Sequence, residues 1–165
     1  MKTLSVKQPW ADALVDGEKT IEVRSRSTPH RGPLLICACA APKNVFWHDH
    51  VDHVNRVFYA GCIIGIVDLL DCRPMKKSDE YAALCDYQLG AFAWVTKPIS
   101  FCRPEPILGK LHLFEVPDDM IVRVGNDEDD WTYSYPPRRV KSNSPKDAGC
   151  WNRLSRTEFP RTTPL

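Results

Sequence analysis

The sequence lacks the features that mark several large classes of protein. It contains no apolar run long enough to cross a membrane, no apolar signal segment after Met1 and no Cys-x-x-Cys pair. Its formal net charge is only +1, so any affinity for nucleic acid has to come from a local basic patch. Because the seven cysteines are an odd number without such a pair, we expect reduced thiols in a soluble, cytoplasmic protein that does not bind membranes.

Signatures of common catalytic and metal sites are also missing. There is no Gly-x-Ser-x-Gly nucleophile elbow and no phosphate-binding loop, and His112 lies in a predicted strand without a nucleophile partner. His48, His50 and His53 suggest a metal site, but on a helix His48 and His50 differ by about 200°, so the three cannot converge on one ion. We therefore interpret them as solvated side chains and expect no metal and no cofactor.

What the sequence does contain is enough apolar residues for one globular domain. Its 165 residues are 43% hydrophobic, which suits a single domain with a real core. Strands are expected at 4–7, 20–24, 33–40, 61–71, 91–95 and 111–116, and helices at 9–16, 43–59 and 78–89. Because five or six strands follow one another with only two or three helices, the pattern predicts an α+β fold with a mixed or antiparallel sheet curled into a barrel.

One segment, residues 17–24, concentrates the polar chemistry of this domain. Gly17 suits the end of a helix, and the alternation that follows places Glu22 and Arg24 on one strand face with Lys19 beside them. Arg26 and Arg31 add positive charge in the loop after the strand. Spacing alone leaves two alternatives, a solvated ion pair or the floor of a cleft.

Several pieces of the chain together resemble the ASCH domain, named for homology to activating signal cointegrator 1. They are Gly17-x-Lys19-x-x-Glu22-x-Arg24, the opening 4–10, and the segments 31–36, 63–68 and 106–111. The resemblance covers roughly residues 3–116 and implies a β-barrel of the PUA-like superfamily. It also implies a cleft beside residues 17–24 whose ligand is RNA, single-stranded or structured, or a modified nucleoside.

The resemblance assigns candidate ligand-binding residues, which are Lys7, Gln8, Trp10, Lys19, Glu22, Arg24 and Trp94. Arg24 can fork onto a phosphate or a base edge, and Glu22 can accept from an exocyclic amine or hold Arg24 in place. Trp10 or Trp94 can stack on a base, a contact worth ~1–3 kcal/mol, although both tryptophans are by default core residues.

The same resemblance implies an alternative, a metal-independent hydrolase. Some ASCH proteins hydrolyse the acetyl amide of N4-acetylcytidine with a Lys, a Thr and a carboxylate, and ribonuclease activity is associated with others. Here Lys19 matches the base, Glu22 stands where the Thr belongs, and Asp68 can replace the acid. Because the nucleophile is missing, recognition of a ligand is the leading hypothesis.

The chain after residue 117 differs in character, so we predict an ASCH domain at 1–117 and a C-terminal extension at 118–165. Six acidic residues and one basic residue lie between 118 and 130, and seven basic and two acidic residues follow to the end. Five prolines after Tyr135 favour irregular structure. The extension is expected to contact RNA or a protein partner, or to fold over the barrel.

Overall fold

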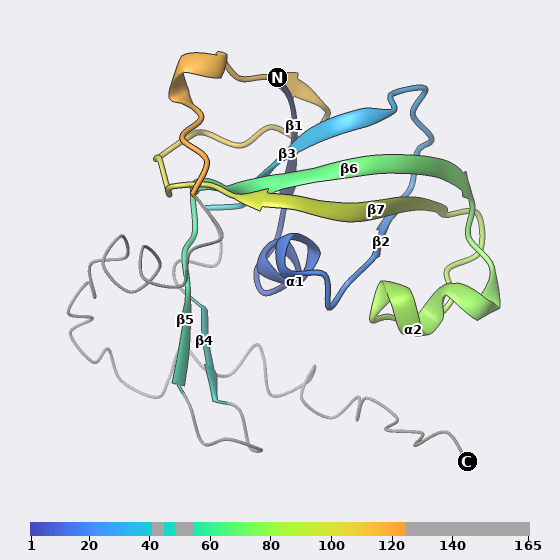
Figure 1. Cartoon of the computed structure of the whole chain (residues 1–165). Helices are drawn as coiled ribbons and strands as arrows, with labels where there is room; N and C mark the ends of the chain where they lie inside the picture. Colours follow the sequence, from blue (N-terminus) through green and yellow to red (C-terminus); the bar gives the residue numbers. More distant parts are fainter. Residues whose placement is uncertain (41–44, 49–54, 125–165) are drawn as a thin grey trace. The chain divides into compact units, whose positions relative to one another are not determined.

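A six-stranded mixed sheet forms the body of the protein. The computed structural model describes residues 1–40, 45–48 and 55–124 (Figure 1). The strands of this sheet are β1 (Lys2–Val6), β2 (Ile21–Arg24), β3 (Gly32–Ala38), β6 (Cys62–Pro74), β7 (Phe92–Phe101) and β8 (Phe114–Glu115). Their order is β2-β7-β6-β3-β1-β8, with β1 and β3 parallel and the other pairs antiparallel. The predicted mixed α+β sheet is therefore confirmed.

The sheet is curled but its hydrogen-bonded ladder does not close. The order begins at β2 and ends at β8, and among the described strands these two edges do not pair. β8 pairs only with Lys2 and Thr3, so the second half of β1 also lies at an open edge. The structure is a half-barrel with a seam between β2 and β1, where the sequence predicted a barrel.

Helix α1 (Trp10–Asp16) packs against one face of the sheet (Figure 1). It ends at Gly17, whose φ of 92° is the left-handed conformation that glycine adopts without a steric penalty. This agrees with the predicted helix end. Strand β2 begins four residues later, so the short connection from α1 delivers Lys19 and then Glu22 to the edge of the sheet.

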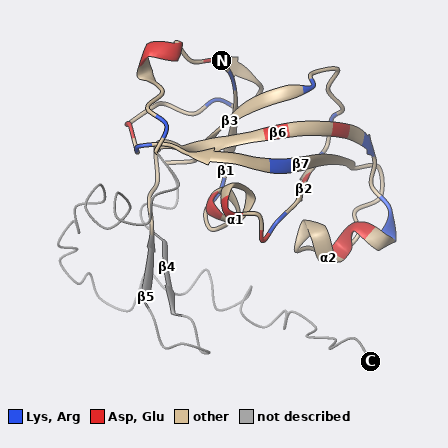
Figure 2. Ribbon diagram, in the orientation of Figure 1, with Lys and Arg blue, Asp and Glu red and all other residues tan. Residues whose placement is uncertain are grey.

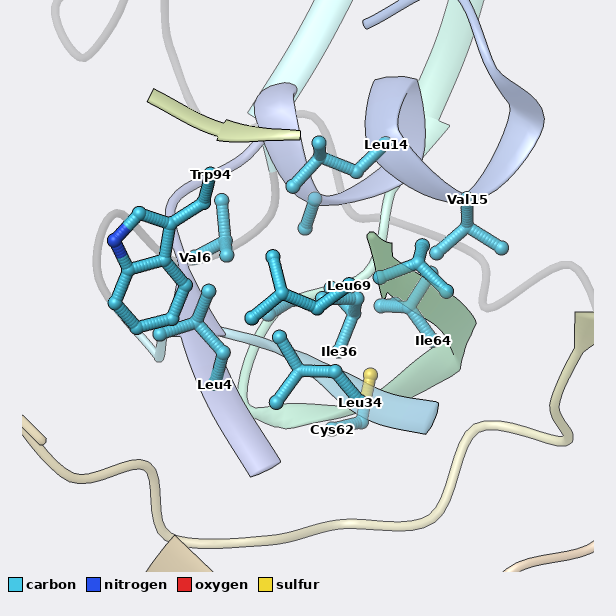
Figure 3. Close-up of a cluster of buried hydrophobic side chains, with 13 residues drawn as sticks. Leu4, Val6, Leu14, Val15, Leu34, Ile36, Cys62, Ile64, Leu69 and Trp94 are labelled. Carbon is cyan, nitrogen blue, oxygen red and sulfur yellow. The ribbon is translucent and has the colours of Figure 1, made fainter. Parts of the chain in front are cut away.

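Strand β3 is buried on both faces and contributes to two of the three core clusters in the described part of the chain. Leu34 and Ile36 belong to a cluster with Leu14 and Trp94, while Leu35, between them, belongs to a second cluster with Phe114. Successive strand residues point to opposite faces, so a continuous apolar run is what a doubly covered strand needs. Figure 3 shows the first cluster, in which Trp94 lies beside Leu4 and Val6. Within the expected core run 33–40, residues 34–38 are buried as predicted, whereas Pro33 and Ala40 are exposed.

β6 and β7 are longer than the sequence predicted. β7 continues to Phe101 through Pro98, although a proline cannot donate to the ladder. It is accommodated opposite Val67, where the register of β6 shifts between Ile66 and Val67. The strand therefore continues beyond residue 95, where the sequence predicted its end.

The helix predicted at 43–59 is wrong where the structure describes it. Val45–His48 (β4) and Asn55–Phe58 (β5) are strands of an antiparallel pair, with Val45 opposite Phe58 and His48 opposite Asn55. Short runs of β-branched and aromatic residues favour strands, and two such runs joined by a connection form a hairpin. His50 and His53 lie outside the described residues.

The helix predicted at 78–89 is much shorter than expected. A 3-10 turn, η1 (Lys77–Asp79), leads into α2 (Glu80–Ala83), and Leu84 ends it in the left-handed conformation with φ of 50°. Asp79 stabilises the start of this segment by accepting from the backbone N–H of Lys76 at 2.8 Å. Arg73 holds the same carboxylate through two hydrogen bonds of 2.7 and 2.8 Å, which keep the pKa of Asp79 at about 2.

A third helical turn, η2 (Asp118–Met120), follows β8, and the backbone after it bonds to the end of β7. No helix in the described part of the chain is long and apolar enough to span a bilayer. Free thiols in that part of the chain include Cys37, Cys39, Cys72, Cys85 and Cys102. Most of the C-terminal extension, from residue 125 onward, lies outside the described residues.

Candidate ligand-binding site

Two cations, Lys19 just before β2 and Arg24 at its end, form ion pairs with the same carboxylate, that of Glu22. Glu22 Oε2 lies 3.5 Å from Lys19 Nζ, and Glu22 Oε1 lies 3.6 Å from an Arg24 guanidinium nitrogen. Exposure rises along the series, from 4% for the Lys19 side chain and 11% for Glu22 to 27% for Arg24. Glu22 and Arg24 thus share a face, as the alternation predicted, and the group runs from the interior toward the surface.

Lys19 is enclosed by elements distant in sequence. Its ammonium group donates a hydrogen bond to the carbonyl of Ala83, at the end of α2. It also lies 5.9 Å from the centre of the Trp10 ring, a distance at which a cation is attracted to the ring face. Lys19 therefore joins α1, β2 and α2 and offers little surface to a ligand.

Glu22 is the buried centre of this group. Burial raises the pKa of Glu22 above its usual range, because a low-dielectric surrounding disfavours the charged form. Lys19 and Arg24 act in the opposite direction through their positive charges. Their attraction makes Glu22 an anchor that fixes where the Arg24 guanidinium lies.

Arg24 reaches from this group into a cavity at the seam of the sheet. One of its guanidinium nitrogens lies 3.5 Å from the carbonyl oxygen of Ser5 on β1, so the side chain bridges the two open edges. The cavity has a volume of about 630 Å³. Its lining comprises Leu4, Val23, Arg24, Ser25, Arg26, Ser27, Thr28, Trp94, Leu111, His112 and Leu113. That lining contains two arginines and no carboxylate.

Trp94 forms part of the cavity wall and is itself a core residue. Only 5% of it is exposed, and its indole N–H donates to the backbone carbonyl of Arg26 at 3.0 Å. This arrangement leaves little of the ring for stacking on a base. Trp10 is half-buried and packs against the first core cluster, where it meets Lys19.

Gln8 and Lys7, at the start of α1, have different surroundings. Gln8 is 1% exposed and its amide donates to Asp12 Oδ1 at 3.1 Å and to the Tyr59 carbonyl at 2.8 Å. Its hydrogen-bonding groups are thus occupied within the fold. Lys7 is exposed. Burial raises the pKa of the Cys39 thiol, and the positive charges of Arg24 and Lys7 act in the opposite direction, so both cations lie near that thiol.

Asp68 lies on the other face of the sheet from Glu22. Glu22 is opposite Trp94 and Asp68 is opposite Lys97, and cross-strand partners share a face. Trp94 and Lys97 are three residues apart on β7, so their side chains point to opposite faces. Figure 2 shows the basic stretch of β7 beside the acidic stretch of β6. The structure therefore does not bring Asp68 to Lys19.

Of the cavity residues outside β2, sequence reasoning named Trp94 as a candidate and missed the others. The charge of Arg26 in the loop after β2 was a signal, but nothing local placed Ser25 and Ser27 beside residues 111–113. His112 lies before β8 in a loop, not in the predicted strand, and it lines the cavity. Arg31 is instead paired with Asp71 at 3.2 Å. Within the described ranges no group of His, Cys, Asp and Glu is arranged to hold a metal.

Comparison with known proteins gives one family. The model of the ASCH domain matches residues 4–105. Activating signal cointegrator 1 from Homo sapiens is 39% identical over 88 residues, and the mouse (Mus musculus) protein of that name is 39% identical over 89. Each alignment covers 47% of this chain but only 15% of the relative, so the chain spans a small part of those proteins.

The fold also has a counterpart among solved structures. The crystal structure of ASCH from Zymomonas mobilis superposes with a TM-score of 0.51, covering 72% of this chain and 89% of that one. The two sequences are 16% identical, so the likeness concerns the fold alone.

Proposed function

Because the chain belongs to the ASCH domain family, we propose that it is a binding module for RNA or a modified nucleoside, which it takes up in the seam cavity. The observation that carries the proposal is the position of Arg24, anchored by a buried carboxylate on one side and open to the cavity on the other. A guanidinium held in this way is suited to two parallel hydrogen bonds with a phosphate or a base edge.

The size and chemistry of the cavity support a nucleotide-sized ligand. Small-molecule sites commonly enclose roughly 300–1,000 Å³ and combine apolar walls with a few oriented polar groups. The volume of about 630 Å³ is within that range. Leu4 and Trp94 supply the apolar wall, while Arg24 and Arg26 supply positive charge. Lys19 and Glu22 are not among the residues that line the cavity, and their role is to position Arg24.

Replacing Arg24 tests this proposal. We expect Arg24→Ala to weaken binding of single-stranded RNA by roughly 10- to 100-fold, because a charge-assisted hydrogen bond contributes about 1.5–3 kcal/mol. Fluorescence anisotropy on the full chain at several salt concentrations measures it, and wild-type affinity should fall as salt rises. Arg103→Ala is the matched control, since Arg103 is 64% exposed and does not line the cavity. Equal affinities for Arg24→Ala and wild type, with both folded, would refute the site.

A metal-independent hydrolase is the second candidate, favoured by the raised pKa of Glu22 beside Lys19 at 3.5 Å, since such a carboxyl can donate a proton. Two observations weigh against the hydrolase. The side chains of Lys19 and Glu22 are both buried, and Asp68 lies on the opposite face of the sheet. Incubation with N4-acetylcytidine and with single-stranded RNA decides between the candidates. Turnover that Lys19→Met abolishes would establish the hydrolase, whereas binding without turnover is the result we expect.

A further inference from the structure

We propose that the seam cavity contains a phosphate subsite formed by Arg26 and the hydroxyls of Ser25 and Ser27, so that the ligand has to carry a phosphate. The inference rests on the proposed function and narrows it, from any nucleoside or RNA to phosphate-bearing nucleotides. The three residues form the loop that follows β2 and lines one side of the cavity.

The first argument is charge. Arg24 has a carboxylate beside it at 3.6 Å, so its charge is partly balanced within the protein. Among the described residues, no carboxylate lies within 4.0 Å of the Arg26 guanidinium, and the cavity lining holds no acidic side chain. Lys19 and Arg24 share the one carboxylate of Glu22, and Arg26 adds a further positive charge that no described carboxylate balances. A guanidinium in this position favours an anionic phosphate, either a diester of RNA or the monoester of a nucleotide, over a neutral sugar or base.

The second argument is hydrogen-bonding capacity. Ser25 and Ser27 are exposed, and neither hydroxyl bonds to another described residue. Both can donate to phosphate oxygens beside Arg26. Thr28 differs, because its Oγ1 accepts from the backbone N–H of His30 at 3.1 Å. We therefore assign the subsite to the two serines and leave Thr28 to the structure of the loop.

The third argument is that the loop is held in place before a ligand arrives. The Trp94 indole N–H fixes the Arg26 carbonyl at 3.0 Å. Two residues further on, the Thr28 carbonyl accepts from Arg31 at 3.1 Å and its N–H faces Cys72 Sγ at 3.4 Å. A loop fixed on both sides loses little conformational entropy on binding. Trp94 is thus a positioning residue for Arg26, which explains a nearly buried tryptophan at a binding site.

Matched ligands with and without a phosphate test the subsite. NMR titration of the full chain compares cytidine, cytidine 5′-monophosphate, inorganic phosphate and a single-stranded RNA. We expect the nucleotide to bind at least tenfold more tightly than cytidine. Inorganic phosphate should bind at least tenfold more weakly than the nucleotide, because it makes no contact with Leu4 or Trp94. Inorganic phosphate binding as tightly as the nucleotide would overturn the nucleotide assignment.

Three variants assign the effect to residues. Arg26→Gln should remove the preference for the nucleotide over cytidine and lower the salt slope of RNA binding by about one. Arg103→Gln should leave both unchanged. Trp94→Phe removes the indole donor to the Arg26 carbonyl and shortens the apolar wall, so it should lower the affinity for the nucleotide more than the affinity for cytidine and thereby reduce the nucleotide-to-nucleoside ratio. A ratio unchanged in both Arg26→Gln and Trp94→Phe would refute the subsite.

The outcomes separate this inference from the function on which it rests. Equal binding of cytidine and its monophosphate to wild type would remove the phosphate subsite and leave nucleoside binding intact. Absence of binding by the nucleoside, the nucleotide and the RNA would instead remove the proposed function.

Discussion

At the residue scale, Asp12 in the first turn of α1 is the carboxyl group whose titration has the clearest consequence. Burial raises the pKa of Asp12 to about 6, and Asp16 adds to that effect through its like charge. The hydrogen bond from Gln8, 3.1 Å long, opposes it. The folded protein thus holds a proton at Asp12 over a pH range in which the unfolded chain, with a pKa near 3.8, has released it.

Asp12→Asn should therefore change how stability depends on pH. A raised pKa in the folded state means that the contribution of Asp12 is favourable below pH 3.8 and is lost as pH rises through about 6. At pH 7 we expect Asp12→Asn to be more stable than wild type by about 1–2 kcal/mol, discounting the shift because Asp12 is partly exposed. Urea unfolding at pH 4 and pH 7 measures the difference. A variant that is less stable than wild type at pH 7 would contradict the expectation.

The site residues show what a local pattern contains and what it omits. The alternation of residues 20–24 correctly paired Glu22 with Arg24, because strand faces depend only on spacing. The pattern did not predict that Lys19 is buried, because this burial depends on Ala83, 64 positions away, and on the Trp10 ring. Nor did it predict that Arg26 lines the same cavity as residues 111–113, which depends on the curl of the sheet.

At the scale of elements, Gly65 lets β6 lie close to Val15 of α1. A Cβ built on Gly65 would lie 2.4 Å from Val15 Cγ1 and 2.7 Å from the backbone oxygen of Ser100. Both distances are shorter than a real Cβ contact allows, and the second involves backbone that cannot rotate away. The glycine is therefore required by the packing of three elements.

Gly65→Ala should destabilise the protein by about 3 kcal/mol, the upper range for overpacking a core. Adding Val15→Ala should recover only part of the loss, because the Ser100 oxygen still obstructs the new methyl group. Thermal unfolding of both variants provides the measurement. A double variant as stable as Val15→Ala alone would show that the backbone contact is unimportant.

The hairpin β4–β5 shows why one element was assigned to the wrong class. Trp47, Val51, Val54 and Phe58 recur at three- and four-residue steps, the period of an amphipathic helix. The runs 45–47 and 57–58 are also short stretches of β-branched and aromatic residues, which favour strands. Over so few residues, the spacing typical of a helix and the composition typical of strands occur together, so the sequence does not distinguish the two. By contrast, β3 and β6 were predictable because long continuous apolar runs with β-branched residues fit a doubly covered strand.

At the scale of the whole molecule, the segment after β8 is bonded to the body beyond the boundary predicted at residue 117. Arg103 N–H donates to the Val122 carbonyl at 2.8 Å, and Val124 N–H donates to the Phe101 carbonyl at 3.0 Å. Ile121 packs against the second core cluster. These contacts extend the ladder at the end of β7.

A chain ending at Pro117 should consequently unfold at a lower temperature than one ending at Val124. Two backbone hydrogen bonds and a half-buried isoleucine contribute about 2 kcal/mol, which corresponds to a shift in Tm of about 5 °C. Differential scanning calorimetry measures it, with the full chain as reference. Equal Tm values for the two shortened chains would support the boundary at 117. The chain ending at Val124 also tests whether a protein partner uses the extension.

The open seam between β2 and β1 has a mechanical consequence. The ladder holds these strands only through the rest of the sheet, and among the described contacts the Arg24 side chain reaches across from β2 to β1. A ligand that contacted Leu4 on β1 and Arg24 on β2 would join the two edges of the seam. Because it would bind the folded protein and not the unfolded chain, it would raise the free energy of unfolding by RT ln(1 + [L]/Kd).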